Sequence, residues 1–188
     1  MYPFVRLAWQ LWLHRTDPPL PVTGEHVSHH LCLPWDVDGF GELNNGRTLT
    51  LYDLGRFTAG GRMGLTPVLR RRRWGLAVAG ASVRYRRRVT PFQRIEMRTR
   101  CVGWDARFFY ILQAMWVRGE CTSQVLLRTA VTSREGAVAT AGVLAEMGHE
   151  TVPPEMPAWV AAWIDAEGAR PWPPETGALP GGHVPPAL

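Results

Sequence analysis

Residues 74–133 constrain the fold more than any other part of the chain, because they contain four consecutive stretches of strand type. Short turns that contain Pro, Gly or Asp separate these stretches. Connections this short join neighbouring strands that run in opposite directions, so the pattern predicts an antiparallel meander. The expected strands cover about 76–89, 94–104, 106–118 and 121–133.

A long helix is expected before this sheet. Asn44 or Asn45 can cap its N-terminus, and apolar side chains continue on more than one side of the helix to about Met63. A strand at 26–33 and a loop at 34–43 should precede it. A helix that is apolar on several sides must be buried, and the sheet is the element available to bury it. The sequence therefore predicts an α+β fold in which the long helix lies across one face of the antiparallel sheet.

The expected domain covers residues 22–150, and shorter segments flank it. Residues 135–147 are Ala-rich and fit either a weak helix or a loop. A C-terminal helix is expected within 151–170. The segment 171–188 holds too many Pro and Gly residues for a packed element, so we expect a disordered tail there.

The N-terminal segment 1–21 is expected to form an amphipathic helix followed by a Pro-rich linker. Arg6, Gln10 and His14 recur every four residues and form a narrow polar stripe on an otherwise apolar helix. Such a helix can dock on the domain or on a second subunit, and it also fits peripheral contact with a membrane through residues 2–14. The apolar stretch is too short to span a bilayer and lacks a cleavage site, so we expect an unprocessed chain without a membrane span.

The charged residues and cysteines narrow the class of partner and compartment. The chain has 188 residues and a formal net charge of +5, and all 21 of its Lys and Arg residues are Arg. Planar guanidinium groups suit phosphate and carboxylate ligands, although biased codon usage would give the same composition. The cysteines at 32, 101 and 121 lack C-x-x-C spacing, so neither a disulfide framework nor a zinc knuckle is expected, and a cytoplasmic location fits best.

Two carboxylates lie in the loop before the long helix. Asp36 and Asp38 precede a Gly-containing turn that ends at the expected helix N-terminus. Free backbone N–H groups there can bind the oxygen of a polarised carbonyl, and a nearby carboxylate can act as a base or nucleophile. This arrangement suits acyl transfer. Spacing alone favours a simpler interpretation, a turn rich in Asp and Asn with a helix cap.

The loop sequence from Trp35 to Arg47, W-D-V-D-G-F-G-E-L-N-N-G-R, resembles the W-x-D-x-D-x-x-G-H-x-N-N signature of hotdog-fold acyl-CoA thioesterases. The similar branch is that of hydroxybenzoyl-CoA thioesterase, and the resemblance extends over about 22–150. It implies a long helix wrapped by an antiparallel sheet and an acyl-CoA substrate that is hydrolysed without metal or cofactor. It also implies edge-to-edge homodimers or dimers of dimers, with active sites at the dimer interface.

The resemblance assigns roles to individual residues. Asp38 is the catalytic carboxylate, as general base or nucleophile, and the N–H near Asn45 polarises the thioester carbonyl. Asn44 and Asp36 are expected to support the loop. Glu42 stands where His is common, which adds negative charge beside Asp38 and raises the alternative of an acyl-CoA-binding protein without hydrolysis.

Two further groups of residues have competing interpretations. Asp53, within the long helix, has a supporting role or simply pairs with Arg56 or Arg47. Arg84, Arg86 and Arg88 would share one strand face, where they either contact the phosphates of coenzyme A or remain solvated. No nucleic-acid motif accompanies these arginines, so nucleic acid is not an expected partner.

The remaining candidates are metal ligands. On a strand, His26, His30 and Cys32 would lie on one face and His29 on the other. Their spacing matches no known zinc site, so a bound metal is not expected.

Overall fold

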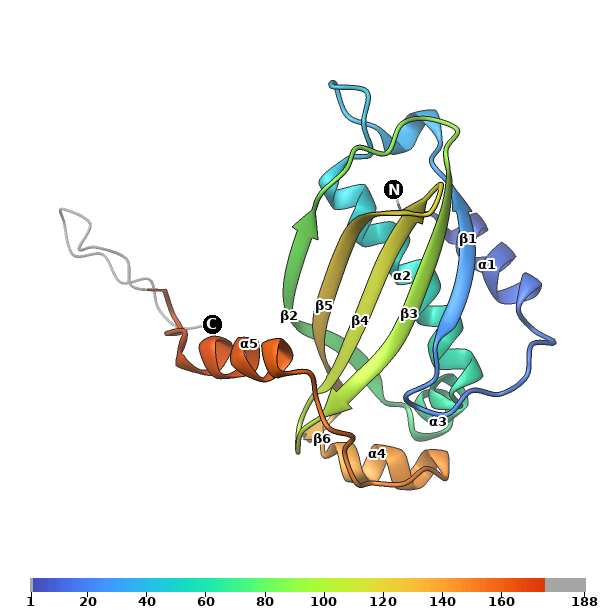
Figure 1. Ribbon diagram of the computed structural model, residues 1–188. Helices are drawn as coiled ribbons and strands as arrows, with labels where there is room; N and C mark the ends of the chain where they lie inside the picture. The colour runs from blue at the N-terminus through green and yellow to red at the C-terminus, as the bar shows by residue number, and fades with distance from the viewer. Residues whose placement is uncertain (1, 175–188) are drawn as a thin grey trace. The chain divides into compact units, whose positions relative to one another are not determined.

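A computed structural model describes residues 2–174, and its first compact unit, Met1–Glu155, contains an antiparallel sheet that curls around one long helix (Figure 1). The sheet order is β1-β3-β4-β5-β2, and β6 pairs with β5. Within residues 2–174 the strands are β1 (His26–Leu31), β2 (Gly75–Tyr85), β3 (Arg94–Trp104), β4 (Phe109–Val117), β5 (Glu120–Ser133) and β6 (Gly136–Val138). The α-helices are α1 (Phe4–Leu13), α2 (Asn45–Arg62), α3 (Leu65–Arg72), α4 (Thr140–Met147) and α5 (Ala158–Ala169).

The long helix α2 packs on the concave face of the sheet. Its Leu51, Tyr52 and Leu54 are fully buried. Gly55 allows the closest approach, because a Cβ atom there would lie 2.5 Å from the sulfur of Met97 on β3. The core around α2 also includes Ile95, Met115, Val125 and Leu127 from the sheet. The expected α+β fold, with a buried helix across an antiparallel sheet, is confirmed.

The first strand alternates as the sequence predicts. His26 and His30 are buried while His29 faces outward. The His30 imidazole contacts the Ser28 hydroxyl at 2.9 Å, and burial lowers the pKa of His30 to about 3. This histidine is therefore a neutral core residue.

The arginine-rich end of β2 differs from the sequence prediction. The strand ends at Tyr85 and not near 89, because the N–H groups of Arg86 and Arg87 both donate to the carbonyl of Thr122 and turn the chain away. The expectation that Arg84, Arg86 and Arg88 share one strand face is therefore wrong. Only Arg84 belongs to β2.

The helix α3 and the short strand β6 were not anticipated, and the structure decides between the two alternatives for residues 135–147. The helix α3 follows α2 directly, with Pro67 in its first turn, where the missing N–H costs no helical hydrogen bond. The segment expected as a weak helix or loop, 135–147, forms the short strand β6 and the helix α4.

The second compact unit begins at Met156 and contains α5. The residues beyond 174 lie outside the described part of the chain, and with them most of the expected tail at 171–188. Within residues 2–174, no helix combines the length and hydrophobicity that crossing a membrane requires.

Candidate functional site

The loop between β1 and α2 is built around the buried carboxylate of Asp36. One oxygen lies 2.6 Å from the Arg6 guanidinium of α1 and accepts the N–H of Leu33, and the other lies 2.9 Å from Arg47 of α2. The Asp36 carbonyl accepts the N–H of Asn44 at 3.0 Å. Asp36 is thus the structural centre of the loop, where it joins two helices and has no exposed surface.

A tight hairpin follows and presents the second carboxylate. Asp38 accepts the N–H of Gly41 with its carbonyl, and its own N–H donates to the Glu42 carbonyl at 2.9 Å. Gly41 has φ +72°, which favours glycine at this position of the turn. One carboxylate oxygen of Asp38 accepts the N–H of Phe40 at 2.8 Å. Within residues 2–174 no other hydrogen bond or ion pair engages this half-buried carboxylate, so its second oxygen is open to water or a ligand.

The N-terminus of α2 is capped, yet one of its N–H groups remains available. The Asn44 side chain accepts the N–H groups of Gly46 and Arg47 at 2.9 and 3.2 Å. Among residues 2–174 the exposed N–H of Asn45 has no partner. A donor at the positive end of an 18-residue helix can stabilise an oxyanion.

A polar cavity of about 230 Å³ lies beside this helix N-terminus. Glu42 projects into it and forms an ion pair with Arg88 at 3.0 Å. Tyr85, at the end of β2, donates to the Asn45 carbonyl at 3.3 Å and forms one wall. The cavity is lined by Glu42, Leu43, Asn45, Thr48, Tyr85, Arg86, Arg87, Arg88, Val89, Thr122 and Ser123.

Four of the nine residues selected from the sequence meet at this point. Glu42, Asn45, Arg86 and Arg88 line the polar cavity, and Asp38 is adjacent to Glu42 across the hairpin. Arg84 is not part of the site. Its neighbour Val83 packs against the core, so alternation along β2 turns the Arg84 side chain to the other face of the sheet.

A second cavity, of about 450 Å³, lies between the C-terminal half of α2 and the concave face of the sheet. Its walls are mainly apolar, and α3 and α4 contribute Leu65, Leu69 and Met147, which the sequence prediction did not anticipate. Asp53 lines its wall and forms an ion pair with Arg56, which the sequence left open as an alternative. Asp53 lies about 12 Å along the helix from Asn45, at the usual rise per residue.

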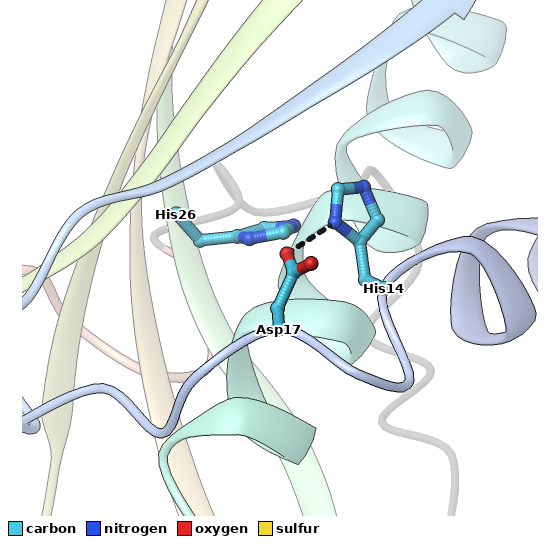
Figure 2. Close-up of side chains that lie close together, drawn as sticks. All are labelled: His14, Asp17 and His26. Carbon is cyan, nitrogen blue, oxygen red and sulfur yellow. Dashed lines mark hydrogen bonds and ion pairs between the residues drawn. The ribbon is translucent and has the colours of Figure 1, made fainter.

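A third cluster joins the N-terminal linker to α2 and β1. Figure 2 shows His14, Asp17 and His26 close together, with the His14 ring 2.7 Å from the Asp17 carboxylate. The Arg62 guanidinium lies 3.4 Å from that carboxylate and 3.0 Å from His26. Burial, assisted by His14 and Arg62, lowers the pKa of His26 to about 4. Because Arg62 already places a positive charge beside Asp17, a bound metal cation is disfavoured there. The cluster fits a structural role better, in which it holds the N-terminal linker against α2 and β1.

Comparisons with known proteins identify a family and a shared fold. A model of the thioesterase-like superfamily matches residues 32–164. Protein THEM6 of Xenopus laevis is 31% identical over 166 residues, which cover 86% of this chain and 78% of the relative. Protein THEM6 of Danio rerio is 36% identical over 97 residues, which cover 52% of this chain and only 48% of that relative, about half its length. The crystal structure of a DHNA-CoA thioesterase from Staphylococcus aureus has a similar fold, with a TM-score of 0.59 and 9% identity over 77% of this chain and 91% of the other.

Proposed function

The chain belongs to the thioesterase-like superfamily and has the hotdog fold, and from this we propose that it hydrolyses an acyl-CoA thioester to a free acid and coenzyme A. The observation that carries the proposal is the short loop that joins the Asp38 hairpin to the N-terminus of α2. Asp38 is hydrogen-bonded to Glu42 across the hairpin, and Glu42 and Asn45 both line the arginine-lined cavity. Together they offer a base or nucleophile, an oxyanion donor and cations for phosphate.

The proposed reaction uses these groups in two alternative ways. As a general base, Asp38 takes a proton from water while the water oxygen attacks the thioester carbonyl, and the C–S bond then breaks to release the thiol. As a nucleophile, Asp38 itself attacks the thioester carbonyl, and the C–S bond breaks so that coenzyme A leaves as a thiolate, which takes a proton from solvent. The mixed anhydride that remains on Asp38 is hydrolysed by water in a second step, which releases the free acid and restores the carboxylate. In both cases the Asn45 N–H stabilises the negative charge that develops on the carbonyl oxygen.

The two cavities suit the two halves of the substrate. The mainly apolar cavity of about 450 Å³ has a volume typical of small-molecule sites and would hold the acyl group. The polar cavity would hold the pantetheine end, with Arg86 and Arg88 directed to phosphate. Asp36 and Asn44 would hold the loop, and Asp53, paired with Arg56, would support the wall of the apolar cavity.

The phosphate assignment is tested with Arg88→Ala. We expect about a tenfold rise in KM for an acyl-CoA, since a hydrogen bond to a charged group contributes about 1.5 kcal/mol. The same acyl group on pantetheine lacks the nucleotide phosphates, so its KM should change little. Arg84→Ala, on the other face of the sheet, is the matched control. An equal rise in KM for both thioesters would contradict phosphate binding by Arg88.

We further propose that two copies pair along β2. This strand forms one edge of the sheet, carries the sequence G-L-A-V-A-G-A-S-V, and is exposed at nearly every position. An unpaired apolar edge of this length invites pairing with another strand. The polar cavity lies at its end, beside Tyr85, so a second copy would help to enclose it.

Charges placed on this edge should prevent pairing. Ala77→Lys combined with Ser82→Lys is expected to convert a dimer into a monomer and to lower kcat/KM at least about tenfold. Ala77 and Ser82 alternate along the strand with residues that face the core, so their side chains point away from it and the fold should tolerate lysine at both positions. Light scattering and thiol release check the two effects. A double variant that remains dimeric would contradict pairing through β2.

A second candidate function is acyl-CoA binding without turnover, and Glu42 is the observation that favours it. Glu42 takes the place of the His in the family signature and adds a carboxylate beside Asp38 and the oxyanion donor. A binding protein would bind acyl-CoA in calorimetry and release no thiol.

Thiol release from a panel of acyl-CoAs tests the proposed function. The panel should include short, medium and long aliphatic acyl groups and one aromatic acyl group. Hydrolysis predicts saturable release of thiol for at least one class of acyl group. Binding of the panel in calorimetry without release would favour the second candidate instead.

A further inference from the structure

The N-terminal helix α1 is attached to the domain by its polar side chains and by Leu7, which packs against the core. Arg6 contacts Asp36 and donates to the Leu31 carbonyl at 2.8 Å. Gln10, four residues later, is buried and donates to the His29 carbonyl at 3.0 Å. His14 follows after four more residues and pairs with Asp17. Positions spaced in this way lie on one side of a helix, so the polar side of α1 faces the protein.

The opposite side of α1 presents large apolar side chains to solvent. This is the reverse of the usual orientation of an amphipathic helix on a globular domain. Val5 is 85% exposed, and Trp9 and Trp12 are 55% and 51% exposed. We call this surface the α1 apolar face; it consists of Phe4, Val5, Trp9, Leu11, Trp12 and Leu13. A continuous apolar patch of this kind marks an interaction surface.

The side chains of the α1 apolar face have the composition of a bilayer interface. The rings of Trp9 and Trp12 stack with centroids 5.0 Å apart, and the Arg15 guanidinium lies 4.3 Å from the Trp12 ring. Arg94 lines a groove together with Trp9 beside the helix. Residues 2–16 contain no Asp or Glu. Tryptophan with flanking arginine and no acid suits a lipid surface, and the positive charge is complementary to anionic headgroups.

The length and position of α1 also suit contact with a lipid surface. Its 10 residues extend about 15 Å, half the thickness of a hydrocarbon core, so the helix is too short to span a membrane and suits a position in the membrane plane. Figure 1 shows α1 beside β1, and β1 and β2 form opposite edges of the main sheet. A second copy paired along β2 would therefore leave the α1 apolar face uncovered.

We propose that the α1 apolar face docks the protein on the surface of an anionic phospholipid bilayer, with the helix parallel to the membrane plane. Trp9, Trp12 and Leu13 enter the boundary between headgroups and acyl chains, and Arg15 and Arg94 contact lipid phosphates. The ion pair between Arg6 and Asp36 then connects the docked helix to the loop that holds Asp38. This docking is independent of whether the chain hydrolyses thioesters.

The test is co-sedimentation of the full chain with vesicles of phosphatidylcholine, with and without about one third phosphatidylglycerol. We expect binding to the anionic vesicles that weakens at high salt. Trp9→Ala with Trp12→Ala should lower the partition coefficient roughly tenfold or more, because two aromatic side chains are lost from the contact. The matched control is Trp159→Ala with Trp172→Ala, which removes two other exposed tryptophans and should leave binding unchanged.

Two further measurements keep the test decisive. Val5→Glu places a charge at the most exposed position of the face and should lower the partition coefficient by a similar factor without changing the fold. Sedimentation equilibrium shows whether α1 joins two copies. Three results would each overturn the proposal. The first is a wild type that binds neither kind of vesicle, and the second is a variant with Trp9→Ala and Trp12→Ala that binds as well as the control variant with Trp159→Ala and Trp172→Ala. The third result is a dimer that depends on Trp9 and Trp12.

Discussion

Asp38→Asn is expected to lower kcat for acyl-CoA hydrolysis by about 10²–10⁴-fold, the usual contribution of a positioned base or nucleophile. The amide keeps the oxygen that accepts the N–H of Phe40, so the hairpin should retain its shape. It cannot take a proton from water or form an anhydride. Thiol release at saturating substrate measures the loss, and KM should change by much less.

Glu42→Gln is the matched control for this substitution. Glu42 is adjacent to Asp38 across the hairpin. Like Asp38→Asn, the substitution Glu42→Gln replaces a carboxylate with an amide of the same shape. We expect kcat to change by less than about tenfold, because Glu42 is engaged with Arg88. Full activity in Asp38→Asn together with an inactive Glu42→Gln would reassign the reactive carboxylate to Glu42.

Asp36→Ala is expected to destabilise the protein by about 3 kcal/mol. Asp36 is fully buried between Arg6 and Arg47, and its removal takes away the carboxylate that both guanidinium groups contact in partly buried positions. For a chain of this size the midpoint of thermal unfolding should fall by roughly 6–12 °C. Urea unfolding followed by circular dichroism measures the change in free energy.

The control for this prediction is an exposed ion pair. Glu146 contacts Arg71 and Arg72, whose side chains are about half exposed, so Glu146→Gln should lower the urea midpoint much less than Asp36→Ala does. If Asp36→Ala unfolds at the same urea concentration as the wild type, Asp36 is not the structural centre of the loop.

The fold was predictable where local pattern and burial coincide. The strand expected at 94–104 agrees with β3, because its alternating residues are buried on α2. The helix expected from Asn44 to about Met63 agrees with α2, whose cap and apolar sides are both local signals. The end of β2 could not be predicted, because it depends on hydrogen bonds to Thr122, which lies more than 30 residues later in the chain.

The candidate site was predictable only in part, for the same reason. The motif from Trp35 to Arg47 located the loop and the helix N-terminus. It did not reveal that Asp36 pairs with Arg6, which lies 30 residues earlier in the chain. The narrow polar stripe of α1 was visible in the sequence, yet its direction toward the domain follows only from tertiary contacts. The cluster of His14, Asp17 and His26 likewise has no characteristic spacing.

The most direct test of the central claim is the number of thiols released per protein chain by the purified wild type. The acyl-CoA that binds most tightly in calorimetry should be supplied in large excess, and free acid and coenzyme A should be quantified by mass spectrometry. Hydrolysis predicts many equivalents of both products in equal amounts, at a rate that Asp38→Asn lowers at least about 100-fold. Tight binding with less than one equivalent of product would contradict the claim that this chain is a thioesterase.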